Sequence, residues 1–528
     1  MPARSLSDHP NLEHLRNQAR ALQRAVRRAD PDALRRVVDR GVDLPADPTS
    51  FALHGAQLVL AREYGFASWP RLRRYLDVVA EYRWDVSTVT EPAGGEVADS
   101  AAAGDEAAGD EAVGSVGADV ADEFCRLACL TYSDDGPPRW QRAAELLARH
   151  PELIRDSVWA AAAAVNVDAL RRQVDADPSL VRRRGGPYRW RPLYYLVYSR
   201  LEPAGGRDGV LEAVRLLLRH GADPDEGYLW NGLPTPFTLL TGAFGEGEQG
   251  PVRQPRHPRS VQIARLLLEA GANPNDGQTL YNRMFREDDD HLRLLFEFGL
   301  GTGDGGVWKR RLGDALDSPA DMLRGQLSWA IDHGFTERVR LLARHGVDLV
   351  TPFDDRRTPV ERARLSANRD IVELLLAHGA PAPAPDPVDD LIGAAMAADR
   401  AAVRALVAAH PGVAEGARSR RPGLIVWAAA GGRREAVRLL AELGFDVSAL
   451  GRGDTPVEQP WSTALHHAAA DGDLELASTL LALGADPNVT DLRFGTTPLG
   501  WARHFERSDL VALLEPVTAG GDPAVSTP

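Results

Sequence analysis

The sequence predicts an all-α fold, a helical solenoid in which short hairpin turns separate pairs of helices. Three observations lead to this prediction. The 528 residues are 44% hydrophobic but only 6% aromatic, and the abundant Ala, Leu and Arg lose little side-chain entropy in a helix. The chain is too long for one compact core at roughly 150 residues per domain. A short sequence also recurs along it, with a period of about 33 residues between several copies.

We predict that residues 1–84 form a helical leader. Apolar residues at positions 12, 15, 19 and 22 share one helical face. A later segment, 56–72, contains the turn Gly-Phe-Ala-Ser-Trp-Pro between two further helical stretches. We expect this block to cap the array, because the first unit of a solenoid otherwise exposes its apolar face.

Residues 85–120 predict a flexible acidic linker. They carry nine acidic residues, no basic ones and repeated Ala and Gly. Low hydrophobicity with charge of one sign does not offset the entropy lost on ordering. The repeat array then occupies residues 121–517, and residues 518–528 form a disordered tail.

Units of the array end in a common pattern. Residues 216–225, 266–275 and 480–488 each place a Leu-rich helix end before Gly-Ala-Asp/Asn-Pro. The glycine suits the left-handed position that closes a helix. The proline prevents the helix from continuing and turns the chain into a hairpin. With two helices per unit, the array holds about eleven units.

The unit at 462–488 resembles the ankyrin repeat. The matching residues are Thr463, Leu465, His466, Ala468, Ala469, Gly472, Leu480, Leu481, Gly484, Ala485, Asp486 and Asn488. The resemblance covers most of residues 121–517, and the Gly-Phe-x-Ser-Trp-Pro turn is similar to a leader found before many bacterial arrays of this kind. It implies a scaffold that binds other proteins through its hairpin tips and the concave surface of its first helices.

Composition disfavours several other classes of function. The net charge of −14 opposes binding to nucleic acid, which requires cations along the phosphate backbone. Two cysteines and no apolar leader favour a cytoplasmic protein, and the longest apolar run, 158–165, is too short to span a bilayer. The single lysine, Lys309, indicates a GC-rich genome and lies in no phosphate-binding or Schiff-base motif.

We find no catalytic motif, and we expect no enzyme activity, cofactor or metal. Two Gly-x-Gly-x-x-Gly segments, 245–250 and 301–306, follow no predicted strand and carry acidic residues, so flexible loops are expected there. Cys125 and Cys129 are interpreted as buried small hydrophobes, and His466 as a structural partner of Thr463. One further set recurs once per unit and is expected to pack between neighbouring units: Tyr195, Trp329, Trp427, His467 and Trp501.

The candidate binding residues lie just before the first helix of a unit, at the hairpin tips. Such tips face solvent in the ankyrin fold, and Trp, Tyr and Arg anchor protein interfaces. The alternative is that each tip aromatic packs on the neighbouring hairpin. The residues are Tyr188, Arg189, Trp190, Tyr228, Trp230, Trp461, Arg493 and Phe494.

The sequence therefore predicts a monomeric, non-enzymatic scaffold that binds a protein partner. One alternative is a regulatory or enzyme-associated subunit with an unrecognised activity in the N-terminal block. A nucleic-acid binder is the third hypothesis. We expect neither nucleic acid nor a membrane as partner.

Overall fold

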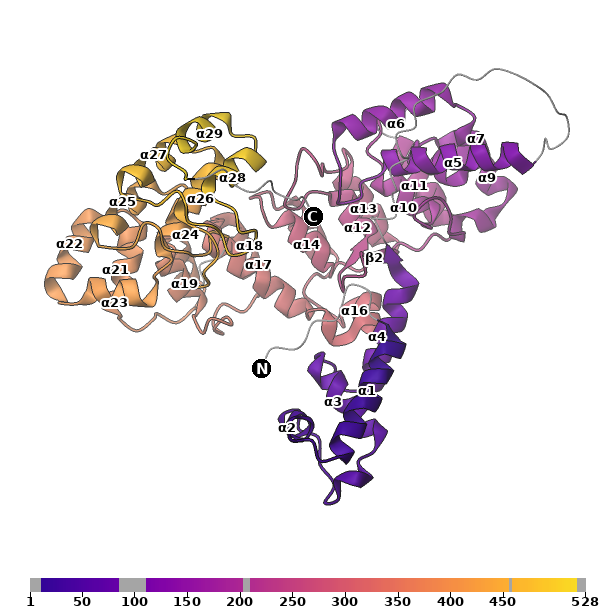
Figure 1. Ribbon diagram of the computed structural model, residues 1–528. Coiled ribbons are helices and arrows are strands. Elements are labelled where there is room, and N and C mark those ends of the chain that lie inside the picture. The colour runs from indigo at the N-terminus through magenta and orange to yellow at the C-terminus, as the bar shows by residue number, and fades with distance from the viewer. Residues whose placement is uncertain (1–10, 85–110, 203–208, 455–457, 520–528) are drawn as a thin grey trace. The chain divides into compact units, whose positions relative to one another are not determined.

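The computed structural model describes residues 11–84, 111–202, 209–454 and 458–519. It is 59% helix and 3% strand, which agrees with the helical prediction. The chain divides into two compact units, Met1–Met322 and Leu323–Pro528, and each is described by itself (Figure 1).

The N-terminal block folds into four helices with a core of its own. Asn11, Asp30 and Ser68 cap three of them, since each side chain accepts backbone N–H bonds at the helix start. The helices are α1 (Leu12–Arg27), α2 (Pro31–Asp39), α3 (Leu53–Glu63) and α4 (Trp69–Tyr82), with a 3-10 turn η1 (Pro48–Ser50). One buried cluster joins α1, α2, η1 and α3: Leu22, Val26, Ala33, Val37, Phe51, Ala56 and Val59.

The rest of the first unit consists of successive helix pairs. The first helices contact one another in the order α5, α8, α10, α12, α14, and the second helices in the order α9, α11, α13, α15. The pairs are α5 (Glu111–Ala128) with α6 (Pro137–Arg149), α8 (Val158–Ala163) with α9 (Val167–Ala176), α10 (Pro192–Tyr198) with α11 (Gly209–Arg219), α12 (Leu239–Phe244) with α13 (Ser260–Glu269), and α14 (Gly277–Arg283) with α15 (Asp290–Glu297). Shorter elements are α7 (Leu153–Asp156), η2 (Pro178–Arg182), α16 (Gly306–Leu312) and η3 (Gly313–Ala315).

A three-stranded sheet connects the N-terminal block to these pairs. β1 (Arg83–Trp84) runs parallel to β2 (Gly227–Trp230), which is antiparallel to β3 (Pro236–Thr238). α4 contacts β2 and α16, and Figure 1 shows the end of α4 beside β2. We expected this block to cover the first unit of the array. It lies instead against a later part, because Leu229, Trp308 and Leu312 complete the apolar cluster on α4.

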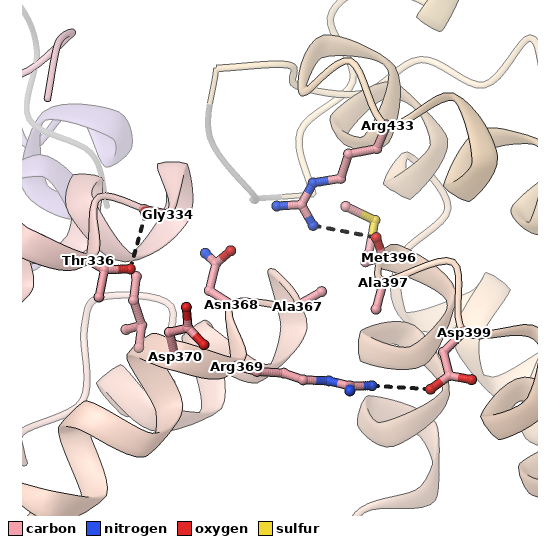
Figure 2. A pocket seen from close by; sticks show the side chains of 11 residues that line it. Gly334, Thr336, Ala367, Asn368, Arg369, Asp370, Met396, Ala397, Asp399 and Arg433 are labelled. Carbon is pink, nitrogen blue, oxygen red and sulfur yellow. Dashed lines mark hydrogen bonds and ion pairs between the residues drawn. The ribbon is translucent and has the colours of Figure 1, made fainter.

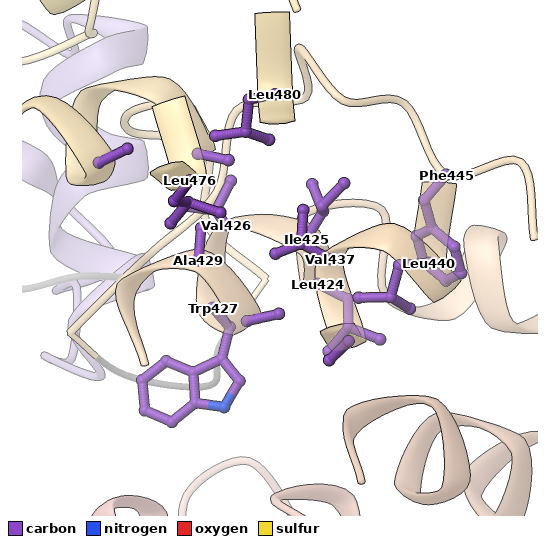
Figure 3. Close-up of a cluster of buried hydrophobic side chains, with 14 of the residues drawn as sticks. Leu424, Ile425, Val426, Trp427, Ala429, Val437, Leu440, Phe445, Leu476 and Leu480 are labelled. Carbon is purple, nitrogen blue, oxygen red and sulfur yellow. The ribbon is translucent and has the colours of Figure 1, made fainter. Parts of the chain in front are cut away.

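The second unit repeats the helix-pair pattern. Its pairs are α17 (Pro319–His333) with α18 (Thr336–Arg344), α19 (Pro359–Leu365) with α20 (Arg369–Ala377), α21 (Pro387–Met396) with α22 (Arg400–Ala409), α24 (Leu424–Ala430) with α25 (Arg434–Glu442), α26 (Ala464–Asp471) with α27 (Leu474–Ala482), and α28 (Pro498–His504) with α29 (Ser508–Leu514). α23 (Val413–Arg420) packs on α21. Figure 3 shows the core where α24, α25 and α27 meet, with Leu424, Leu440 and Leu480 among its side chains.

Several smaller predictions are confirmed. His466 is fully buried; its Nδ1 lies 2.8 Å from Thr463 Oγ1, and its Nε2 lies 3.0 Å from the Thr496 carbonyl. Cys125 and Cys129 are buried free thiols. Trp501 packs edge-on against His467 of the preceding pair, with ring centroids 5.8 Å apart, as the recurring aromatic stripe predicts.

Two predictions about loops need correction. Helix α5 begins at Glu111, inside the expected linker, and continues without a break into the part that carries the buried Phe124; residues 85–110 lie outside the described part. The first half of the segment 245–250 is packed rather than flexible, since residues 245–247 are buried. Glu246 is 5% exposed and forms an ion pair with the fully buried Arg283.

Across the residues that the structure describes, no helix is both long and apolar enough to cross a membrane.

Candidate functional site

The predicted tip residues of the first unit form part of its core. Trp190 is completely buried, and Tyr188 and Tyr228 are 9% and 3% exposed. The ring of Trp84, from the N-terminal block, lies 4.7 Å from that of Trp190 and 5.9 Å from that of Tyr188. The expectation that these three side chains face solvent is therefore wrong, because Trp84 packs on Tyr188 and Trp190, and Tyr228 packs on Trp190 and Tyr194.

The remaining two predicted residues of the first unit are placed differently. Trp230 is half-buried, and its indole N–H donates to the Thr131 carbonyl at 2.9 Å. Arg189 is exposed, with a left-handed φ of 55°, in the tight turn that Gly185 N closes by donating to Trp190 O at 3.0 Å. Of the five residues predicted here, Arg189 alone projects into solvent.

In the second unit, a buried carboxylate organises the hairpin tip at 491–496. Asp491 is 1% exposed, and its Oδ1 accepts the backbone N–H groups of Arg493 at 2.9 Å and Phe494 at 2.6 Å. Its Oδ2 accepts the Thr496 hydroxyl at 2.7 Å and the Trp501 indole N–H at 3.1 Å. Burial acts to raise the pKa of Asp491, but these hydrogen bonds outweigh it and lower that pKa. The tip is thus held rigidly by a charged group beneath it.

This arrangement pushes two large apolar side chains outward. Leu492 is 65% exposed and Phe494 is 57% exposed. Gly495 allows the sharp return of the chain, because its φ of 65° is left-handed. Leu492 N donates to Trp461 O at 2.8 Å, which joins this tip to the preceding hairpin. We call Trp461, Leu492, Arg493 and Phe494 the tip surface.

Arginines flank the aromatic rings of the tip surface. The Arg493 guanidinium carbon lies 5.7 Å from the Trp461 ring centroid and 5.2 Å from that of Phe494. The Arg452 guanidinium lies 4.8 Å from Trp461 and pairs with Asp454 at 2.6 Å. Within the described part of the chain, Arg493 forms no ion pair with a carboxylate. A guanidinium without a carboxylate partner therefore lies beside the half-buried ring of Trp461 and the exposed ring of Phe494.

A polar groove of about 660 Å³ lies elsewhere in the second unit (Figure 2). It is lined by the residues that precede or begin α18, α20, α22 and α25. Arg369 pairs there with Asp399 at 3.1 Å. Arg433 donates to the Ser366 carbonyl at 2.6 Å, and burial lowers the pKa of Arg433.

The groove can hold polar groups, but its charged side chains are balanced. Two arginines, Arg369 and Arg433, and two aspartates, Asp370 and Asp399, line it, so the groove favours neither sign of ligand. Sequence reasoning did not find it. The available signal was a polar residue immediately before three of these four second helices, at Asn368, Asp399 and Arg433.

The tip surface contains three of the eight predicted binding residues: Trp461, Arg493 and Phe494. Sequence reasoning missed Leu492, although Leu-Arg-Phe between Asp491 and Gly495 places an apolar residue where a hairpin tip is normally polar. Among the residues with described positions, no group of three or more His, Cys, Asp or Glu side chains is arranged to hold a metal ion.

Residues 391–491 match the family model described as ankyrin repeats (3 copies). The matched segment runs from α21 to Asp491, so it includes Trp461 and ends at the carboxylate that organises the tip surface.

Proposed function

We propose that this chain is a non-enzymatic scaffold that binds a protein partner through the tip surface. Ankyrin repeats are generally protein–protein interaction modules, and the match at 391–491 adjoins this surface. We further propose that successive helix pairs in each unit form a solenoid, which presents hairpin tips on a rigid support. The low cysteine content supports a cytoplasmic location.

The exposure of Leu492 and Phe494 is the observation that carries this proposal. Large apolar side chains gain roughly 1.5–3 kcal/mol each when they are fully buried. Because Asp491 already fixes the backbone beneath them, little conformational entropy is lost when a partner covers them.

The charge of the tip surface indicates what the partner supplies. Arg493 has an aromatic ring on either side, and the described residues provide no carboxylate for it. A partner that places an Asp or Glu beside an apolar side chain would satisfy Arg493 and bury Leu492 and Phe494 in the same contact.

A matched pair of double variants tests the proposal. The full chain serves as bait, and affinity for the captured partner is measured for Leu492→Ala with Phe494→Ala. The control is Leu376→Ala with Val407→Ala, two apolar residues that are 39% and 40% exposed on α20 and α22 of the same unit. The tip variant should lose about 2–4 kcal/mol of binding free energy, whereas the control should bind like the wild type. Equal binding by both variants would show that the partner contacts another surface.

A further inference from the structure

An aromatic recess in the first unit holds one side chain from outside the helix pairs. Trp84 is 2% exposed, and its ring is edge-on to Trp190, Tyr198 and Phe237, with centroids 4.7, 6.2 and 6.2 Å away. The ring of Tyr188 is a further neighbour, with its centroid 5.9 Å from that of Trp84. We call Tyr188, Trp190, Tyr198 and Phe237 the aromatic recess. Trp84 occupies it as a ligand occupies a binding site.

The segment that carries Trp84 is short and separate from the main attachment of its block. β1 contains two residues, and the Trp84 carbonyl accepts a hydrogen bond from Asn231 N at 2.7 Å. The block is also attached through α4, whose apolar cluster includes Leu229 and Trp308 but not Trp84. Because this cluster does not depend on the Trp84 side chain, residues 83–84 can leave the recess while α4 remains docked.

The closed recess leaves several buried polar atoms without hydrogen-bond partners. Among the described residues of the recess these are Trp84 Nε1, Trp190 Nε1 and Tyr188 Oη. Unpaired buried donors and acceptors oppose the closed state, and opening would expose them to water. Ring packing thus stabilises the closed state of the recess, and the unpaired polar groups destabilise it.

Departure of β1 would also free one edge of the sheet. β2 lies between β1 and β3, so removal of β1 leaves its backbone groups available to another extended chain. Strand pairing on β2 and a ring in the aromatic recess would together select an extended segment that carries a tryptophan.

We propose that residues 83–84 are a displaceable resident ligand, and that the aromatic recess with the β2 edge binds a partner protein presenting a tryptophan on an extended segment. This second binding surface is independent of the tip surface and goes beyond the scaffold function proposed above. The N-terminal block then regulates access to it, because the partner binds only when residues 83–84 have left.

Peptide binding to the full chain tests this proposal. The probe is a fluorescent peptide of residues 80–88, Ala-Glu-Tyr-Arg-Trp-Asp-Val-Ser-Thr, and its control carries the Trp84→Ala change. The Trp84→Ala chain should bind the probe at least about tenfold more tightly than the wild-type chain does, because its recess is empty. It should also prefer the probe over the control peptide by about tenfold or more. A folded Trp84→Ala chain that binds neither peptide, or both equally, would overturn the proposal.

Hydrogen exchange on the wild-type chain provides a test that does not depend on the variant folding. The amides of residues 83–84 and Asn231 should exchange through a local opening, at least about tenfold faster than the amides of α10. Excess probe peptide should accelerate exchange at residues 83–84, and the control peptide should not. Exchange of these amides only together with α10, in one global step, would show that β1 is a permanent part of the fold.

Discussion

Replacement of Trp190 should destabilise the fold by an amount that depends on which atoms are removed. The sequence alone placed Trp190 in a binding surface, so that its loss would change affinity and leave stability intact. In the structure the side chain is completely buried, with four neighbouring rings within 5.0 Å. Trp190→Ala should therefore cost about 3–5 kcal/mol of unfolding free energy, through lost burial and the cavity that remains.

Trp190→Phe separates the contribution of the ring from that of its N–H group. Phenylalanine keeps much of the ring packing and removes Nε1, which has no hydrogen-bond partner among the described residues. Its cost should stay below about 1.5 kcal/mol.

Urea unfolding followed by circular dichroism and fluorescence measures both variants, with Phe494→Ala as the control. Phe494 is 57% exposed, so its removal should change stability by no more than about 0.5 kcal/mol. If Trp190→Ala costs no more than Phe494→Ala, then Trp190 is not a packing residue and the described core of the first unit is wrong.

Three further predictions concern charge, pH and repeat mechanics. Burial, with a smaller contribution from the charge of Arg200, lowers the pKa of His257 from 6.5 to about 3; the folded chain binds this proton less tightly than the unfolded chain, so stability falls as the pH drops below about 6.5. Between about pH 7 and pH 4.5 the unfolding free energy of the wild-type chain falls, and His257→Gln should remove roughly 2–3 kcal/mol of that fall, measured by urea unfolding. A fall of the same size in the variant would contradict this. Arg362→Met leaves Asp332, which is 5% exposed, without its buried partner, and should lower the unfolding free energy by about 3–5 kcal/mol. Adding Asp332→Asn should recover part of that loss in thermal unfolding. No recovery would contradict the pairing. Deletion of residues 496–528 should reduce the helical signal only in proportion to the helix removed, and complete cooperative unfolding would argue against independent repeats.

Local sequence patterns predicted the helices and their ends well. Helix α26 shows this clearly, because three residues define its ends. Thr463 and His466 form a capping box at its start, and Gly472 closes it with a φ of 77°. These features depend on residues within a few positions of one another, so the sequence carries the information directly.

The first unit was harder to predict because its contacts are distant in the sequence. Tyr188 and Trp190 have the residue types of an exposed interface, and nothing near them in the sequence shows that Trp84 packs on them. β1 is only two residues long, which is too short to give a strand signal. Its pairing with β2 is therefore visible only in three dimensions.

Hydrogen exchange of the full chain, alone and saturated with its captured partner, tests the central claim most directly. Binding should protect the amides of residues 488–496 and of Trp461, because the partner covers Leu492 and Phe494. The amides of α20 and α22, which carry the control residues, should show no comparable protection. Protection confined to other parts of the chain, with residues 488–496 exchanging as in the free protein, would contradict the assignment of the tip surface.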